Sequence, residues 1–360
     1  MSALLEVEDL RVQFSRGGQR TTAVDGVSFS VGAGEVVGLV GESGCGKSVT
    51  SLAIMGLLPA RGASVTGSVR FEGTELLTMA PRALARRRGK DLAMVFQDPM
   101  TSLNPVLTLG RQITEVLRAH TELSRGAATR EAVDLLGRVG IPDPRRRMGE
   151  FPHQLSGGMR QRVLIAIALA CSPRLIIADE PTTALDVTIQ AQVLDLLTTL
   201  VRESGTAMVL ITHDLGVVAG TCDRVNVLYA GRVVESATRR QLFASPRHRY
   251  TKGLLDAVPR VDAPAGTPLH PVPGSVRDLL AWDEGCAFSP RCARADDACH
   301  VGGIQLSRRE PETCDIQASD TQTADTQTSD TQTSDTQTSD TSVSGAPEHT
   351  SRCVHPAGVR

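Results

Sequence analysis

Short apolar runs alternate with amphipathic stretches from the beginning of the chain to about residue 245. The most continuous apolar runs are Val36–Val40, Ala93–Phe96, Leu175–Ala178, Met208–Ile211 and Val225–Tyr229. Strands of a parallel sheet have this pattern when helices cover both faces of the sheet, because neither face then meets water. The pattern therefore predicts an α/β domain built on a parallel core sheet.

Other segments of the same region follow different patterns. Near Leu4–Phe14 and Val24–Val31 apolar and polar residues alternate more, which predicts a separate antiparallel sheet. Residues from about Leu107 to Gly140 have helical spacing and few strand signals. We therefore expect a helical insertion inside the α/β domain.

The composition changes after about residue 245. Residues 246–274 are rich in proline, histidine and arginine, which predicts a linker that wraps the surface. A small Cys-rich region, 275–360, follows, and a Ser-Asp-Thr-Gln-Thr repeat interrupts it from about Ser319 to Ser342. Residues 317–348 have no apolar face to bury, so we expect them to be disordered and assign them no function. The predicted organisation is a domain of residues 1–245, the linker and a C-terminal extension.

Overall composition narrows the class of protein. Apolar residues make up 41% and charged residues 22%, as is usual for a globular protein. The formal net charge of -2 gives no indication that nucleic acid or lipid is the main partner. The acidic N-terminus lacks the apolar core of a secretory signal. The longest apolar run, Val163–Cys171, is far shorter than the roughly 20 residues of a membrane-spanning helix.

A phosphate-binding loop follows the first predicted core strand. The segment Gly41-Glu42-Ser43-Gly44-Cys45-Gly46-Lys47-Ser48 matches the Walker A pattern and precedes a helical stretch, Val49–Leu58. Its glycines let backbone N–H groups curl around a β-phosphate, and the helix start adds partial positive charge. In such a loop Lys47 reaches the β- and γ-phosphates and Ser48 is a ligand of Mg²⁺. Cys45 occupies a variable position and is interpreted as a small filler residue.

Two further motifs carry chemistry. The run Leu175–Ala178 ends in Asp179 and Glu180, as a Walker B strand does, where the aspartate holds Mg²⁺ and the glutamate can polarise the attacking water. Ser156, Gly157 and Gly158 precede the apolar helix Arg162–Ala170, which makes a second anion-binding helix start. One ATP needs only one such cradle, so the second is predicted to serve ATP held by a partner ATPase. A plain N-capped helix is the alternative.

These motifs occur in the order of the ATP-binding-cassette (ABC) ATPase family, so residues 4–244 resemble an ABC-type P-loop ATPase domain with a helical signature subdomain. The resemblance implies that Gln97 contacts Mg²⁺ and senses a membrane subunit, and that His213 contacts the γ-phosphate. It also implies that Asp186 lies in the loop that crosses an ATPase dimer interface. Phe14 occupies the place of the aromatic residue that stacks on adenine, although a residue of the strand core is the alternative.

Longer segments are similar to the ATPase subunits of dipeptide and oligopeptide permeases, and within them to the first of two paired ATPases. These segments are Gly41–Leu58, Phe96–Pro105, Asp179–Gln192 and His248–Leu255. In the last of them Arg249 replaces the proline of the family's His-Pro-Tyr-Thr stretch. The ATPases of nickel importers are near relatives but typically lack the Cys-rich extension.

The resemblance implies a protein that couples ATP binding and hydrolysis to peptide uptake at the cytoplasmic face of the inner membrane. Its expected partners are two transmembrane permease subunits, a second and distinct ATPase, and an extracytoplasmic peptide-binding protein, with no nucleic acid. An ATPase that acts on nucleic acid would usually carry two cassettes or long coiled-coil insertions. An exporter would lack the linker of the peptide importers. An inactive structural partner would not keep Lys47, Asp179, Glu180 and His213.

Five of the eight cysteines crowd the last part of the chain: Cys286, Cys292, Cys299, Cys314 and Cys353. In a reducing compartment clustered thiols indicate a metal before disulfides. Their spacing matches neither the common zinc pattern nor the bacterial ferredoxin run. The resemblance implies a [4Fe–4S] cluster on Cys286, Cys292, Cys299 and Cys353, with Cys314 as the rival fourth ligand. Zinc, or no metal, stays an alternative.

Overall fold

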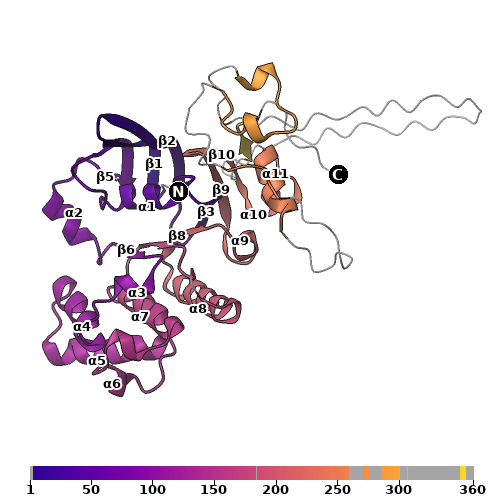
Figure 1. Cartoon of the computed structure of the whole chain (residues 1–360). Helices are drawn as coiled ribbons and strands as arrows, with labels where there is room; N and C mark the ends of the chain where they lie inside the picture. The colour runs from indigo at the N-terminus through magenta and orange to yellow at the C-terminus, as the bar shows by residue number, and fades with distance from the viewer. Residues whose placement is uncertain are drawn as a thin grey trace, which may run out of the picture.

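The computed structural model describes residues 3–183, 185–258, 271–275, 285–300, 306 and 349–353. Two sheets and a layer of helices make up this part of the chain (Figure 1). Cys314 and the repeat tract, 317–348, lie outside the described residues.

The first sheet is antiparallel, as the alternating pattern predicts. It contains β1 (Leu5–Arg16), β2 (Gln19–Val31), β4 (Ala63–Phe71) and β5 (Thr74–Glu75) in the order β2-β1-β4-β5. Gly17 and Gly18, both with positive φ, form the tight turn between β1 and β2. Val7 and Val12 are buried on one face of β1, while Glu8 and Arg11 are exposed.

The second sheet has seven strands in the order β11-β10-β9-β3-β8-β7-β6. The parallel strands are β3 (Val36–Val40), β6 (Leu92–Val95), β7 (Leu175–Asp179), β8 (Ala207–Thr212) and β9 (Arg224–Tyr229). The predicted parallel core is therefore confirmed. Antiparallel strands β10 (Arg232–Thr238) and β11 (Thr350–Ser351) extend one edge. Since β3, β8 and β7 are neighbours, their carboxyl ends meet at one edge, where ligands bind in open α/β sheets.

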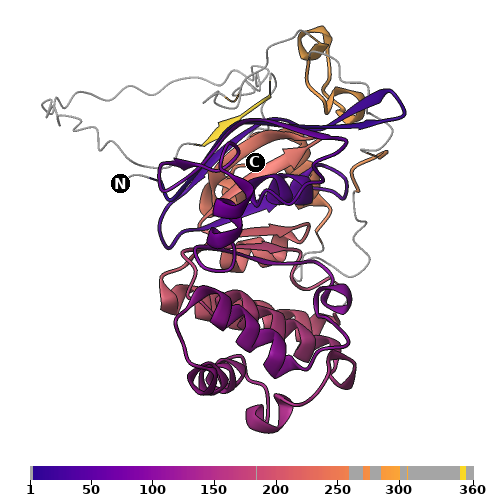
Figure 2. The same cartoon turned by 90° about the vertical axis from the view of Figure 1, so that its left-hand side faces the viewer.

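The helices form two groups. The helices that lie on the sheets are α1 (Lys47–Ile54), α2 (Pro81–Arg87), α8 (Val187–Ser204), α9 (Leu215–Thr221) and α10 (Arg239–Ala244). The helical subdomain contains α3 (Pro99–Ser102), α4 (Leu109–His120), α5 (Arg125–Arg138), α6 (Pro144–Arg147), the 3₁₀ turn η1 (Pro152–Gln154) and α7 (Gly157–Leu169). In Figure 2 this subdomain forms a layer below the sheets. The predicted helical insertion is confirmed, and it continues beyond residue 140 to include α7.

Within the predicted linker, residues Arg249–Asp256 form a helix that packs against the core rather than a surface strap. Helix α11 (Arg249–Asp256) begins at the N-cap His248, whose Nδ1 accepts a hydrogen bond from the Tyr250 N–H at 3.1 Å. Tyr250 is fully buried, and its ring centroid lies 4.6 Å from that of Tyr229 on β9. The extension then continues with the 3₁₀ turns η3 (Ser289–Arg291) and η4 (Asp297–His300).

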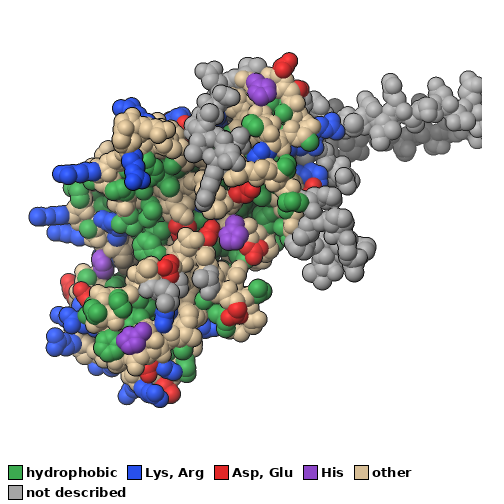
Figure 3. Space-filling model, viewed as in Figure 1, with side chains coloured by type: hydrophobic (Ala, Val, Ile, Leu, Met, Phe, Trp, Pro, Cys, Tyr) green, Lys and Arg blue, Asp and Glu red, His purple; other side chains and the backbone are tan. Residues whose placement is uncertain are grey.

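No helix of the described residues has both the length and the apolar character to cross a bilayer. Lys and Arg side chains gather at the outer edges of the antiparallel sheet and of the helical subdomain (Figure 3).

Candidate nucleotide-binding and hydrolysis site

The loop from Gly41 to Ser48 joins β3 to α1, and its shape depends on glycines. A Cβ atom on Gly41 would lie 2.2 Å from the Leu228 carbonyl oxygen, and one on Gly46 would lie 2.6 Å from that of Ala23. Gly46 also has φ 100, in the left-handed region that L side chains rarely adopt. The tight backbone approach therefore requires glycine at both positions.

Lys47 points back into this loop. Its side-chain ammonium donates hydrogen bonds to the carbonyl oxygens of Gly41 at 2.8 Å and Glu42 at 3.0 Å, and the residue is only 5% exposed. Cys45 is fully buried, and its burial raises the pKa of the thiol. Ser43 and Gly44, by contrast, face solvent at the outer side of the loop. The loop thus holds a positive charge in its concavity, as binding of a β- and γ-phosphate requires.

The loop meets β7 through Ser48 and Asp179. Ser48 Oγ donates to Asp179 Oδ1 at 2.9 Å, and Ser51 Oγ lies 3.5 Å from Oδ2. Burial raises the pKa of Asp179, and the hydrogen bond from Ser48 acts against that shift. A hydroxyl and a carboxylate in contact next to a phosphate loop form the oxygen donor set that Mg²⁺ prefers. The residues therefore fit the cation that the sequence predicts.

Glu180 lies at the centre of a polar group at the end of β7. Its Oε2 accepts hydrogen bonds from Gln97 Nε2 and Thr183 Oγ1, each at 2.9 Å, and its Oε1 lies 3.4 Å from His213 Nδ1. Glu180 has φ 45, a left-handed conformation that is costly for this residue and frequent at active sites. The structure thus brings together the three predicted catalytic side chains. It adds Thr183, which sequence reasoning quoted only as part of a motif.

The predicted second cradle lies in the helical subdomain, whereas Figure 1 places α1 among the sheets. Ser156 is the N-cap of α7, and its Oγ accepts a hydrogen bond from the Met159 N–H at 3.4 Å. A Cβ atom on Gly158 would lie 2.6 Å from Ile189 Cγ2, and one on Gly157 would lie 3.3 Å from Leu185 Cδ2. Glycine at these positions lets the start of α7 pack closely on the start of α8.

The remaining predicted residues lie on nearby elements. Asp186 is the N-cap of α8, and its Oδ1 accepts a hydrogen bond from the Ile189 N–H at 3.0 Å. Phe14 is half-buried on β1, where it packs against the core of the antiparallel sheet. Both an aromatic contact for adenine and a core role are compatible with that position.

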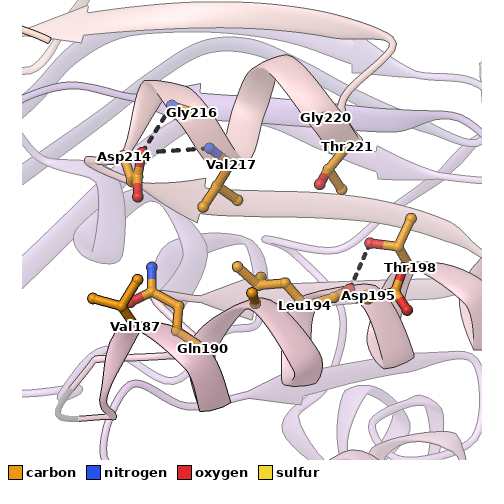
Figure 4. Close-up of a pocket in the computed structure, with 11 residues that line it drawn as sticks. Val187, Gln190, Leu194, Asp195, Thr198, Asp214, Gly216, Val217, Gly220 and Thr221 are labelled. Atoms are coloured by element: carbon orange, nitrogen blue, oxygen red, sulfur yellow. Dashed lines mark hydrogen bonds between the residues drawn. The ribbon is translucent and has the colours of Figure 1, made fainter. Parts of the chain in front are cut away.

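A hollow of about 470 Å³ lies between α8 and α9, next to Asp186 and His213 in sequence (Figure 4). It is lined by Val187, Gln190, Ala191, Leu194, Asp195, Thr198, Asp214, Gly216, Val217, Gly220 and Thr221. Asp214 caps α9 by accepting hydrogen bonds from Gly216 and Val217 at its rim. Val187, at the other side, is 83% exposed. The start of α8 thus presents an apolar side chain to the surface.

Two cysteines of the extension, Cys286 and Cys299, lie close together. The Cys286 N–H donates to the Cys299 carbonyl oxygen at 2.8 Å. Burial raises the pKa of Cys286, and the neighbouring Cys299 and Cys292 thiolates raise it further. Cys353 follows β11 and is buried. Within the described ranges no three His, Cys, Asp or Glu residues are arranged to hold a metal ion, so the geometry does not fit the predicted cluster.

Sequence reasoning missed two residues that contact the phosphate loop from the C-terminal side. The Tyr250 hydroxyl accepts a hydrogen bond from the Glu42 N–H at 2.9 Å. The Arg291 guanidinium pairs with the Glu42 carboxylate at 2.7 and 3.0 Å. Neither contact can be predicted from the local sequence, because Tyr250 lies 208 positions and Arg291 lies 249 positions from Glu42.

The strand order, the Ser48–Asp179 contact and the group around Glu180 are those of an ABC ATPase. The family model described as "ABC transporter" matches residues 24–183. Among solved structures, the ATP-binding cassette MJ0796 in a dimeric post-hydrolysis state bound to ADP and Pi has a TM-score of 0.59 and 28% sequence identity. That match covers 66% of this chain and 99% of the other. The chain is therefore an ABC ATPase.

Two further comparisons give the subfamily. The model "Oligopeptide/dipeptide transporter, C-terminal region" matches residues 234–299. The oligopeptide transport ATP-binding protein OppD of Escherichia coli (strain K12) is 52% identical, over 82% of this chain and 88% of its own length. The dipeptide transport ATP-binding protein DppD of Bacillus subtilis (strain 168) is 51% identical, over 81% and 87%. The chain belongs to the ATP-binding subunits of oligopeptide and dipeptide ABC transporters.

Proposed function

We propose that this chain is the ATP-hydrolysing subunit of an ABC importer that takes up dipeptides or oligopeptides. The main support for the proposal is a group of contacts at one edge of the core sheet. There Ser48 contacts Asp179, and both Gln97 and His213 contact Glu180. The relatives OppD and DppD, which share about half of their residues with this chain, are named as oligopeptide and dipeptide transport proteins, and this supports peptides as the transported solute.

In the proposed reaction the phosphate loop binds ATP and Lys47 compensates the charge of the β- and γ-phosphates. Ser48 and Asp179 would hold Mg²⁺, which when bound neutralises charge that develops on the phosphates. Glu180 accepts a proton from the attacking water, and Gln97 and His213 orient that carboxylate from either side. These residues act mainly by positioning and by electrostatics.

We further propose that ATP clamps this ATPase to a second, distinct one. Ser156, Gly157 and Gly158 would face ATP held by the partner, because they begin a helix away from this chain's own phosphate loop. Asp186 and the exposed Val187 beside it would lie in the contact between the ATPases. Two transmembrane permease subunits near Gln97 and an extracytoplasmic peptide-binding protein complete the proposed assembly, on the cytoplasmic face of the inner membrane.

Glu180→Gln tests the hydrolytic part of the proposal. Turnover should fall by about 10²- to 10⁴-fold, as is typical for loss of a general base, while the Kd for ATP stays close to that of the unchanged chain. Glu203→Gln is the matched control, because Glu203 is exposed on α8 and should behave like the unchanged protein. Full ATPase activity in Glu180→Gln would overturn the role of Glu180.

Co-purification from membranes, with mass identification, tests the transport part. Recovery of two permease subunits, a second ATPase and a peptide-binding protein would support a peptide importer. Recovery of a binding protein for nickel would redirect the proposal to a metal importer. Ribosomal or DNA-repair partners without any membrane protein would overturn the transport role.

A [4Fe–4S] cluster on Cys286, Cys292, Cys299 and either Cys353 or Cys314 stays a prediction. The contact between the Cys286 N–H and the Cys299 carbonyl oxygen brings two of these cysteines close, whereas the arrangement of the described residues is against a metal site. No step of ATP hydrolysis depends on it. Anaerobically purified protein with neither bound iron nor broad visible absorption would eliminate the cluster.

A further inference from the structure

Glu42, the second residue of the phosphate loop, is bound at three points. Its N–H donates to the Tyr250 hydroxyl at 2.9 Å, and its carbonyl oxygen accepts from Lys47 Nζ at 3.0 Å. Its carboxylate pairs with both terminal nitrogens of Arg291, at 2.7 and 3.0 Å. Lys47 belongs to the loop itself, whereas Tyr250 and Arg291 come from the C-terminal part of the chain. The extension therefore contacts the backbone and the side chain of a residue that shapes the phosphate site.

Arg291 is held rigidly for this contact. Its side chain is 4% exposed, and its Nε donates to the Pro273 carbonyl oxygen at 2.6 Å. Nη2 also contacts the carbonyl oxygens of Gly274 at 3.2 Å and Val272 at 3.3 Å, and the guanidinium lies 5.7 Å from the centre of the Tyr229 ring. Because the planar guanidinium of Arg291 donates hydrogen bonds to all of these acceptors, it has little freedom to rotate away from Glu42.

A carboxylate inside a phosphate-binding loop needs such a partner. The loop binds an anion with backbone N–H groups and one ammonium, so an unpaired negative charge in it opposes that binding. The bidentate pair with Arg291 neutralises Glu42 and fixes the direction of its side chain. Because the carbonyl group of Glu42 also holds Lys47, displacement of Glu42 would disturb the ammonium as well.

We propose that Arg291 is a positioning residue for nucleotide binding, through which the C-terminal extension completes the phosphate loop by neutralising and orienting Glu42. This inference rests on the proposed function, since it takes ATP as the ligand of the loop. It also gives the segment that carries Cys286, Cys292 and Cys299 a direct mechanical connection to the ATP site.

The test compares variants of the full chain by their Kd for ATP. Arg291→Ala should raise the Kd about tenfold, which corresponds to ~1.4 kcal/mol, because it leaves Glu42 charged and unpaired. In the Arg291→Ala background, Glu42→Gln should restore most of the affinity, because it removes the unpaired charge. Arg294→Ala is the matched control, because Arg294 is exposed in the same segment and should leave the Kd unchanged.

ATPase kinetics separate positioning from mere structural support. Arg291→Ala should raise the KM for ATP and leave kcat at saturating ATP nearly unchanged, since Arg291 does not contact Glu180, Gln97 or His213. If Arg291 only supported the fold, Arg291→Ala would lower the melting temperature, but the protein that stays folded would bind ATP with an unchanged Kd. Glu42→Gln would then have no loss of ATP affinity to restore. If Arg291→Ala does not fold, Arg291→Lys replaces it, with an intermediate rise in Kd because one ammonium substitutes for the fork.

The inference is overturned if the folded Arg291 variants bind ATP with the Kd of the unchanged chain, or if Glu42→Gln does not rescue Arg291→Ala. That result would leave the ATPase function standing. Failure of the unchanged chain itself to bind ATP would instead remove the proposed function, and this inference with it.

Discussion

One buried carboxylate, Glu235 on β10, joins two segments of the C-terminal part to the core sheet. It is fully buried, and its Oε1 accepts hydrogen bonds from the Arg247 N–H and from His349 Nε2, each at 2.7 Å. Its Oε2 accepts from the His248 N–H at 2.9 Å. His349 directly precedes β11, so the same carboxylate holds the start of α11 and the strand that pairs with β10.

Replacement of Glu235 should therefore be strongly destabilising. Glu235→Ala leaves two backbone N–H groups and an imidazole buried without an acceptor, and each such group costs about 1–3 kcal/mol. Because the three buried donors lose their acceptor together, we expect the free energy of unfolding to fall by about 3–5 kcal/mol. Glu235→Gln keeps one oxygen for Arg247 and His349 but turns an amide NH₂ toward the His248 N–H, so we expect a smaller loss of about 1–3 kcal/mol.

Urea unfolding followed by far-ultraviolet circular dichroism at pH 7 measures both losses. Glu203→Gln, an exposed carboxylate on α8, is the control and should stay within about 0.5 kcal/mol of the unchanged chain. Values for both Glu235 variants inside that same range would refute the reasoning, because the three hydrogen bonds would then contribute nothing net.

Three further predictions concern one close backbone contact and two buried side chains. Gly41→Ala places a Cβ atom 2.2 Å from the Leu228 carbonyl oxygen, so calorimetry should find ATP binding lost and the melting temperature lowered. Burial lowers the pKa of His248 to about 4 from 6.5, so stability is complete above pH 6.5 and falls as the pH decreases to about 4. The loss is up to ~3 kcal/mol, and it should disappear in urea titrations of His248→Asn, which keeps an N-cap acceptor for the Tyr250 N–H. Cys222 is fully buried with its pKa raised to about 12, so mass spectrometry should find it unlabelled by N-ethylmaleimide in the native protein at pH 8 and labelled in urea.

Sequence reasoning succeeded where a motif dictates its own backbone geometry. The run Val36–Val40 coincides with β3, because a fully buried parallel strand tolerates few polar residues. The proximity of Ser48 and Asp179 follows from the neighbouring carboxyl ends of parallel strands, since β3 and β7 both pair with β8. These local rules were enough to predict the core sheet and the residues gathered at its edge.

The same reasoning failed where a contact depends on distant segments. Strand β11 has two residues, too few for any pattern, and it forms only because β10 offers a free edge and Glu235 an acceptor for His349. Helix α11 lies in a segment whose average composition suggests a linker, and it packs through the buried Tyr250 and Thr251, with Leu254 and Leu255 partly buried beside them. Arg291 can pair with Glu42 only after its own segment and the segment around Pro273 have folded against the phosphate loop, 249 positions away in sequence.

The aromatic cluster at the end of β9 explains why the extension and the phosphate loop are physically linked. Leu228 carries the carbonyl oxygen that closes on Gly41, and the next residue, Tyr229, packs its ring 4.6 Å from Tyr250 and 5.3 Å from Phe288. One strand therefore contacts the phosphate loop through Leu228 and the C-terminal part through Tyr229. A boundary drawn at residue 245 would expose Tyr229 and remove both C-terminal partners of Glu42. The nucleotide site of this chain is thus built by residues on both sides of that boundary.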